Sequence, residues 1–205
     1  MLTAPNLARF AWLTHGFGGR DSSYPAAVTT LRQIHSGIVL EATQPGVDRF
    51  AEGDALVTSQ PGLVIGVRTA DCVPILIADE RTQAVAAIHA GWRGTAEKIA
   101  AQAVRELANR YGSQPQDLHA AVGPAIGGCC YEVGPEVARR LGTETDRAVK
   151  IDLAAINGKQ LAEAGISDVW QARECTLCAA SRYFSLRRER EAAGRMISFI
   201  GAVRP

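Results

Sequence analysis

The sequence predicts a mixed α/β or α+β fold, in which a layered mixed β-sheet carries flanking helices. Two apolar runs lie within 63–79 and a third lies at 84–89. Their length and their Val and Ile content are typical of buried strands. Clear helical periodicity is found chiefly at 95–111 and 152–164. Because strands and helices alternate irregularly, and several strands follow one another directly, a mixed sheet is favoured over a regular parallel one.

Length and composition indicate one globular domain spanning 1–205. A chain of 205 residues can bury a sizeable core, and 47% hydrophobic with 21% charged residues is ordinary for such a domain. The net charge of +1 argues against binding nucleic acid or a membrane through a basic face. The apolar runs are too short to cross a bilayer. The start of the chain lacks the features of a signal peptide, so a cytoplasmic location is expected.

The first half of the chain is expected to consist of short strands joined by turns. A glycine-rich loop at 18–23 contains Arg20. From the residues alone, a flexible turn with a solvated arginine is favoured over a loop that uses Arg20 as an anion contact. His35 lies at a junction between a strand and a turn. The strands expected before the apolar runs are 11–17, 38–40 and 54–58.

The second half alternates helices and strands. Thr95 and Asp152 suit the N-caps of the two periodic segments, and Gly112 and Gly165 suit their C-terminal ends. The glycine-rich loop at 123–134 matches neither a Walker nor a Rossmann spacing. The remaining elements expected are a strand at 118–122, a short helix from Pro135 to Leu141, a strand beginning at Val169 and a closing strand at 196–203.

Three residues carried by predicted strand ends and turns form the first candidate site: His35, Cys72 and His89. Two imidazoles and a thiolate would leave a fourth tetrahedral position open, as in a catalytic zinc site. Alternatively, Cys72 is a nucleophile with a histidine as its base and Asp71 nearby. The third interpretation is a buried cysteine with two hydrogen-bonded histidines. The spacing matches no zinc-finger motif, so the residues alone leave all three open.

The other four cysteines form a second candidate site: Cys129, Cys130, Cys175 and Cys178. A closed four-cysteine zinc site and packed free thiols are the alternatives. The free thiols are favoured, because adjacent cysteines rarely bind one metal and C-x-x-C often occurs by chance. The total of five cysteines is odd, and in a reducing compartment no functional disulfide is expected among them.

A charged run at 187–191 follows Tyr183 and Phe184. Its default interpretation is a solvated helix face. The two aromatic side chains beside it make base stacking, or covering of a substrate, the alternative.

Taken together, several blocks of the sequence resemble the laccase-domain family. This family was formerly described as multicopper polyphenol oxidases and is now described as zinc-dependent purine nucleoside phosphorylases. The blocks occur in the family's order and cover nearly the whole chain. They are 32–37 (RQIHSG), 54–58 (DALVT), 68–74 (RTADCVP), 88–94 (IHAGWRG), 122–127 (VGPAIG), 129–133 (CCYEV), 175–176 (CT), 184–185 (FS) with 187–188 (RR), and 194–195 (GR).

The resemblance implies that His35, Cys72 and His89 bind zinc and take part in catalysis. It also implies that the substrates are a small purine nucleoside and phosphate. Adenosine, inosine, guanosine or S-methyl-5'-thioadenosine would be cleaved to a free base and a ribose 1-phosphate, with adenosine deamination as a further activity. A multicopper oxidase fits poorly, because it needs more imidazoles than four histidines supply. Copper is the alternative metal, and a cysteine hydrolase or a copper-dependent polyphenol oxidase is the alternative function.

Phosphorolysis requires an anion site and stabilisation of developing charge. Arg20 and Arg68 are the predicted phosphate residues, because guanidinium offers a bidentate fork, and Gln33 is placed with them as a substrate contact. Asp71, next to Cys72, is predicted to transfer protons, since the H-x-E and P-C-x-x-C signature of zinc base deaminases is absent. The sequence predicts neither the preferred nucleoside nor the oligomeric state.

Overall fold

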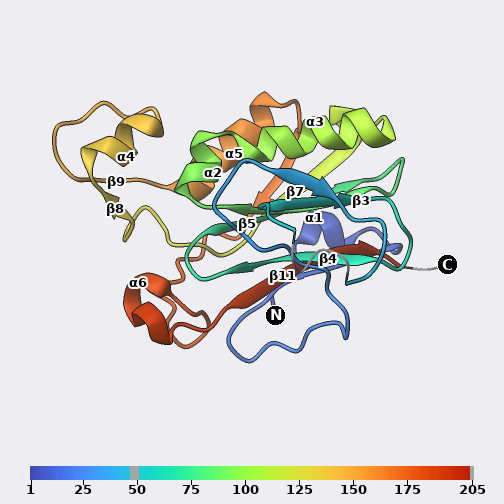
Figure 1. Ribbon diagram of the computed structural model, residues 1–205, viewed down its shortest axis with the longest axis horizontal. Helices are drawn as coiled ribbons and strands as arrows, with labels where there is room; N and C mark the ends of the chain where they lie inside the picture. Colours follow the sequence, from blue (N-terminus) through green and yellow to red (C-terminus); the bar gives the residue numbers. More distant parts are fainter. Residues whose placement is uncertain (47–50, 204–205) are drawn as a thin grey trace.

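The computed structural model describes residues 1–46 and 51–203. A six-stranded mixed sheet packs face to face on a three-stranded antiparallel sheet, and helices cover the outer face of the larger sheet (Figure 1). In the larger sheet, with strand order β10-β7-β5-β6-β3-β2, the two outermost pairs are parallel and the others antiparallel. The predicted layered mixed sheet with flanking helices is therefore confirmed.

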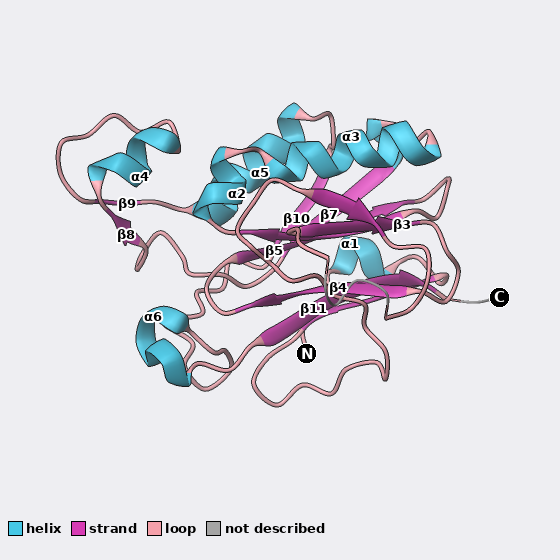
Figure 2. Ribbon diagram, viewed as in Figure 1, coloured by secondary structure: helices cyan, strands magenta, loops and turns pink. Residues whose placement is uncertain are grey.

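The larger sheet contains β2 (Val39–Glu41), β3 (Ala55–Thr58), β5 (Val73–Asp79), β6 (Val85–Ala90), β7 (Leu118–Val122) and β10 (Asp168–Gln171). The smaller sheet contains β1 (Leu13–Phe17), β4 (Val64–Thr69) and β11 (Met196–Ala202). The helices on the larger sheet are α2 (Trp92–Ala96), α3 (Ile99–Tyr111) and α5 (Leu153–Glu163), as Figure 2 shows. The shorter elements are α1 (Pro5–Ala8), α4 (Pro135–Arg140), α6 (Leu186–Glu189), the 3-10 turns η1 (Pro115–Asp117) and η2 (Arg190–Ala192), and the pair β8 (Glu132–Val133) and β9 (Val149–Lys150).

Strand β5 is buried along its whole length because both of its faces are covered. Ile75 and Ile77 belong to the core between the sheet and the helices, whereas Leu76 and Ala78 belong to the core between the two sheets. Successive side chains of a strand point to opposite faces, so a continuous apolar run is what this position requires. Strands β5 and β6 therefore provide a rigid frame for the residues at their ends.

The helix expected at 95–111 is two helices, and this prediction was wrong in its N-terminal part. Helix α2 begins at Trp92, directly after β6, and Lys98 separates it from α3 in a left-handed conformation with φ 57°. Thr95 is not an N-cap but lies buried in α2, where its hydroxyl accepts from Asn157 Nδ2 at 2.9 Å. The other predicted caps are confirmed: Asp152 accepts from the Ala155 N–H at 2.9 Å, and Gly112 ends α3 with φ 67°.

The predicted strands of the two halves are present, and their bounds differ from the prediction by at most two residues. Within residues 1–46 and 51–203, no helix combines the length and the apolar character that a bilayer crossing would need.

Candidate active site and metal centre

The structure brings His35, Cys72 and His89 together where two central strands of the larger sheet, β5 and β6, have adjacent ends. Cys72 immediately precedes β5 and His89 is near the end of β6, and the antiparallel register pairs Pro74 with His89. His35 comes from the loop before β2. Their ligand atoms all lie within 4.8 Å of one another, and the rings of His35 and His89 meet edge to face with centroids 4.9 Å apart.

The three side chains differ in burial, which decreases from His89 through Cys72 to His35. His89 is 3% exposed, Cys72 is half-buried and His35 is exposed. The group is therefore held firmly on the protein side and opens toward solvent on the other. A tetrahedral metal bound by two imidazoles and one thiolate would keep its fourth position on the open side. This donor set fits zinc, and copper also binds such ligands.

Asp54 organises the three-residue group, although the sequence pattern indicated only that it starts a strand. It is fully buried, and its carboxylate lies 2.8 Å from His89 Nδ1. The same carboxylate accepts from the backbone N–H of His35 at 3.0 Å and from that of Ser36 at 2.6 Å. It thereby leaves Nε2 of His89 for a metal and fixes the turn in which His35 adopts φ 60°. Such a carboxylate–histidine pair orients a ligand and raises its basicity.

Hydrogen bonds and opposite charges among Asp54, His89 and Cys72 stabilise the ionised form of each group. Burial raises the pKa of the Cys72 thiol, but hydrogen bonds from His35 and His89 outweigh it and lower the pKa to about 6. Burial likewise opposes ionisation of Asp54, but its bonds to His89 and Ser36 lower its pKa to about 2. Asp54 and Cys72 together raise the pKa of His89 above its ordinary value, against the effect of burial. Near neutral pH, Cys72 is therefore ready to act as a thiolate ligand.

Gly91 allows the close approach of these side chains. A Cβ atom at this position would lie 3.0 Å from Cδ2 of His35 and 3.3 Å from Sγ of Cys72. Both distances are tighter than ordinary van der Waals contact. Glycine at the N-cap of α2 is thus explained by the space that His35 and Cys72 occupy.

We expect Asp54→Asn to weaken zinc binding about 10- to 100-fold, the range typical when the partner of a metal-bound histidine is removed. The amide keeps the shape of the side chain but loses the charge that holds His89 in its tautomer. Zinc affinity can be measured by competition with a chromogenic chelator. Asp79→Asn, at a buried carboxylate in the β5–β6 turn, is the matched control and should leave the affinity unchanged. Unchanged affinity in Asp54→Asn would contradict the orienting role.

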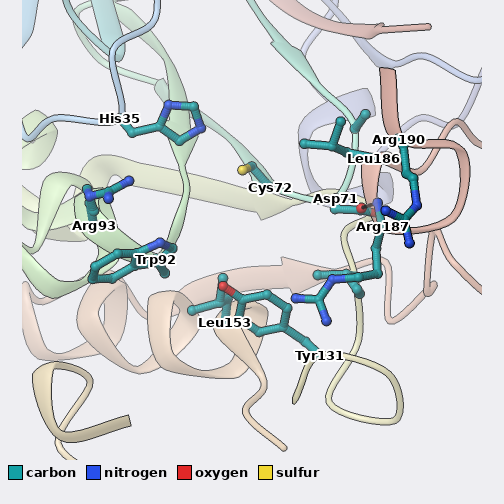
Figure 3. Close-up of a pocket in the computed structure, with 12 residues that line it drawn as sticks. His35, Asp71, Cys72, Trp92, Arg93, Tyr131, Leu153, Leu186, Arg187 and Arg190 are labelled. Carbon is teal, nitrogen blue, oxygen red and sulfur yellow. Dashed lines mark hydrogen bonds between the residues drawn. The ribbon is translucent and has the colours of Figure 1, made fainter. Parts of the chain in front are cut away.

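A cavity of about 450 Å³ opens beside the three-residue group, and its size suits a small-molecule ligand. Figure 3 shows Trp92 and Arg93 on the His35 side of Cys72, and Arg187 and Arg190 on the other. The guanidinium of Arg93 lies 4.5 Å from the ring centroid of Trp92, and that of Arg187 lies 5.4 Å from that of Tyr131. The lining residues are His35, Ala70, Asp71, Cys72, Trp92, Arg93, Ile126, Tyr131, Leu153, Leu186, Arg187 and Arg190.

Asp71 lies in the wall of this cavity, but its oxygens are engaged. Oδ1 accepts from the hydroxyl of Thr176 at 2.6 Å. Oδ2 accepts from the hydroxyl of Ser185 at 3.1 Å and from the backbone N–H of Arg187 at 2.7 Å. Asp71 also has φ 89°, a conformation that a non-glycine residue holds only when its surroundings enforce it. Its predicted proton transfer stays a prediction, beside a clear role in anchoring α6.

The predicted phosphate residues do not line the cavity. Arg20 forms an ion pair with Glu189, stacks over Phe184 at 4.3 Å and donates to the carbonyl of Ala180 at 2.8 Å. The structure thus places Arg20 against the α6 segment. The side-chain amide of Gln33 exchanges two hydrogen bonds of 2.8 Å with the backbone of Arg68, whose side chain is exposed. These contacts do not test the predicted roles of Arg20, Arg68 and Gln33 in binding phosphate and substrate.

The sequence interpretation missed Asp54, Trp92, Arg93 and Tyr131 as site residues. Trp92 and Arg93 directly follow the segment that holds His89, and Tyr131 follows the adjacent cysteines. Proximity in sequence to the candidate ligands was the signal available for them. Arg187 belonged to a charged run, for which a base-stacking or substrate-covering role was the less favoured interpretation.

The layered fold and the open ligand set beside a small-molecule cavity define a globular protein with a candidate catalytic metal centre. Residues 19–203 match the model of the family described as "Multi-copper polyphenol oxidoreductase laccase". The chain belongs to this family, and the resemblance stated from the sequence is confirmed.

Individual relatives carry more specific names. The chain is 39% identical over 209 residues to the purine nucleoside phosphorylase of Deinococcus radiodurans, covering 98% of this chain and 78% of the relative. It is 39% identical over 161 residues to "Adenosine deaminase RL5" from an unknown prokaryotic organism, covering 72% of this chain and 61% of the relative. The crystal structure of YlmD from Geobacillus stearothermophilus has a TM-score of 0.87 at 29% identity, covering 98% of this chain and 94% of that chain.

Proposed function

We propose that this protein is a zinc-dependent purine nucleoside phosphorylase. It would cleave adenosine, inosine, guanosine or S-methyl-5'-thioadenosine with phosphate, giving a free base and ribose 1-phosphate or its methylthio derivative. The observation that carries the proposal is the open group of His35, Cys72 and His89 in the wall of a cavity that combines aromatic rings with arginines. The name of the Deinococcus relative supports the same reaction.

The residues of the cavity suit the parts of such a substrate. Trp92 and Tyr131 offer ring faces to a purine, and Ile126, Leu153 and Leu186 exclude water around it. Arginines at the rim suit the phosphate dianion. When bound by His35, Cys72 and His89, zinc would supply a Lewis acid next to the reacting sugar. The odd total of five cysteines, among which we expect no disulfide, suits a reducing compartment, so we place the enzyme in the cytoplasm.

The phosphorylase proposal is tested by the phosphate requirement. Base release from inosine should depend on added phosphate and yield ribose 1-phosphate, because phosphate is the attacking group. The products can be separated by chromatography after incubation with and without phosphate. Equal base release without phosphate, with free ribose as the product, would show a hydrolase instead.

The arginines that bind phosphate can be separated by substitution. We propose Arg187 from the cavity lining, and we keep Arg20 and Arg68, with Gln33, as the residues that the resemblance suggests. Arg187→Gln should raise the KM for phosphate about tenfold or more, the effect of losing one charged hydrogen bond of about 1.5–3 kcal/mol. Arg68→Gln is the matched comparison on an exposed strand position. A raised KM in Arg68→Gln alone would assign phosphate to Arg68 rather than Arg187.

Adenosine deamination is a second candidate function, favoured by the open ligand position and the name of one relative. Phosphate-independent conversion of adenosine to inosine would identify it. A multicopper centre is not supported by the residues, since the other two of the four histidines are engaged elsewhere. His15 Nε2 accepts from the backbone N–H of Ala4 at 3.0 Å, and His119 Nδ1 lies 2.8 Å from a carboxylate oxygen of Asp168.

A further inference from the structure

The other four cysteines are gathered into one group by two loops that are distant in sequence. Strands β7 and β10 are parallel neighbours, so the segments that leave them run side by side. The Ala125 N–H donates to the carbonyl of Glu174 at 3.2 Å, and the Thr176 N–H donates to the carbonyl of Ala125 at 3.0 Å. This pairing sets Cys129 and Cys130 opposite Cys175 and Cys178. We call these four residues the cysteine cluster.

The sulfur separations in the cysteine cluster match a metal site rather than a disulfide. The Sγ atoms of Cys130 and Cys178 are 3.4 Å apart, those of Cys129 and Cys130 are 3.5 Å apart, and those of Cys129 and Cys178 are 3.8 Å apart. All four sulfurs lie within 4.8 Å of one another. A disulfide needs about 2.05 Å. Zinc–sulfur bonds of about 2.3 Å in a tetrahedron place neighbouring sulfurs about 3.8 Å apart.

The local backbone explains how adjacent cysteines can share one site. The N–H groups of Cys130 and Tyr131 both donate to the carbonyl of Gly127 at 2.9 Å, which closes a tight turn. This turn brings the sulfurs of Cys129 and Cys130 to the same side. The Gly127 N–H donates to Sγ of Cys175 at 3.3 Å, a contact that favours a thiolate there. A Cβ on Gly127 would lie 3.3 Å from Sγ of Cys129, so glycine leaves the space that the cluster needs.

We propose that Cys129, Cys130, Cys175 and Cys178 bind a second zinc ion, in a closed structural site distinct from the group of His35, Cys72 and His89. Four thiolates complete the tetrahedron, so no position remains for water or substrate. The four thiol protons pass to solvent on binding, and the site carries a net double negative charge. Cys129 and Cys178 are exposed, so water can solvate that charge.

This second zinc would fasten together two segments that build the cavity wall. One segment contributes Ile126 and Tyr131 to the lining. In the other, Thr176 donates to Asp71. The carbonyls of Thr176 and Leu177 accept from the guanidinium of Arg188 at 2.9 and 2.7 Å, next to Arg187 of the lining. The cysteine cluster therefore holds both the aromatic side of the cavity and the support of α6.

The test counts zinc by elemental analysis in protein purified under reducing conditions, with no activity measurement needed. We expect two zinc ions in the wild type, one in Cys178→Ser and one in Cys72→Ser. The double variant should hold none. Ala180→Ser, which adds a hydroxyl to the same exposed turn, is the matched control and should keep both ions. Circular dichroism establishes that each variant is folded.

Cobalt gives an independent reading that does not require the Cys178 variant to fold. In Cys72→Ser loaded with Co²⁺, a tetrahedral four-thiolate site should show strong visible absorption and sulfur-to-cobalt charge-transfer bands, and Cys129→Ser should weaken them. The proposal is overturned if folded Cys72→Ser holds no metal, if Cys178→Ser keeps the wild-type zinc count, or if the cluster contains a disulfide or iron. A failed phosphorylase assay would leave these readings unaffected.

Discussion

Replacing Cys72 with serine is expected to abolish both nucleoside cleavage and zinc binding at the first site, the group of His35, Cys72 and His89. The thiolate is a soft anionic ligand whose pKa is lowered to about 6 by His35 and His89, whereas a serine hydroxyl stays protonated near neutral pH. The three ligands contribute jointly to the free energy of zinc binding. We therefore expect the loss of one ligand to lower the zinc affinity by more than about 100-fold. His35→Ala and His89→Ala should behave alike.

The experiment compares zinc per chain and the initial rate with inosine for the three variants. Zinc is counted for each variant in the Cys178→Ser background, so that a zinc ion in the cysteine cluster does not obscure the count, and the initial rates are compared with Cys178 intact. Cys178→Ser alone is the control and should keep the zinc of the first site. If Cys72 is instead a nucleophile, Cys72→Ser will be inactive with its zinc retained, and His35→Ala will be nearly silent. That pattern would exclude Cys72 as a ligand.

The frame of the site could be predicted from the sequence because its strands are buried on both faces. The apolar runs that form β5 and β6 have no polar face, so their composition alone indicates buried strands. Cys72 and His89 lie at the ends of these runs. Placing His35 beside them depended on the family resemblance, since a loop residue has no periodicity to locate it. The helix break at Lys98 could not be predicted, because α2 is positioned by burial of Thr95 against α5.

The contact partners of long side chains could not be predicted, because these partners come from distant parts of the chain. Arg20 carries the charge a phosphate site needs, but Glu189 and Phe184, from the other end of the chain, provide its partners. Likewise, the sequence pattern predicts only that Asp54 starts a strand. Its role depends on the turn at 34–36, whose backbone N–H groups donate to its carboxylate in the folded protein. The cysteine cluster depends on the parallel pairing of β7 with β10, which local sequence does not specify.

Replacing Asp71 with alanine is expected to lower the free energy of unfolding by about 2–4 kcal/mol, because it leaves two buried hydroxyls and the Arg187 N–H without their acceptor. Alanine also fits poorly at φ 89°. Asp71→Asn should lose less stability, since asparagine tolerates this conformation and keeps one acceptor oxygen. Urea unfolding, followed by fluorescence, measures both.

The pH dependence of kcat separates anchoring by Asp71 from proton transfer. If Asp71 anchors α6, Asp71→Asn will lower kcat and raise the KM for phosphate through Arg187, while the pH profile keeps its shape. Thr176→Val, which removes one donor to Asp71 from a buried position, should reproduce a smaller version of the same changes. If Asp71 transfers the proton, Asp71→Asn will remove one limb of the profile and Thr176→Val will not change the KM for phosphate. Because all three donors to Asp71 come from the segments that carry Thr176 and Arg187, we expect the anchoring pattern.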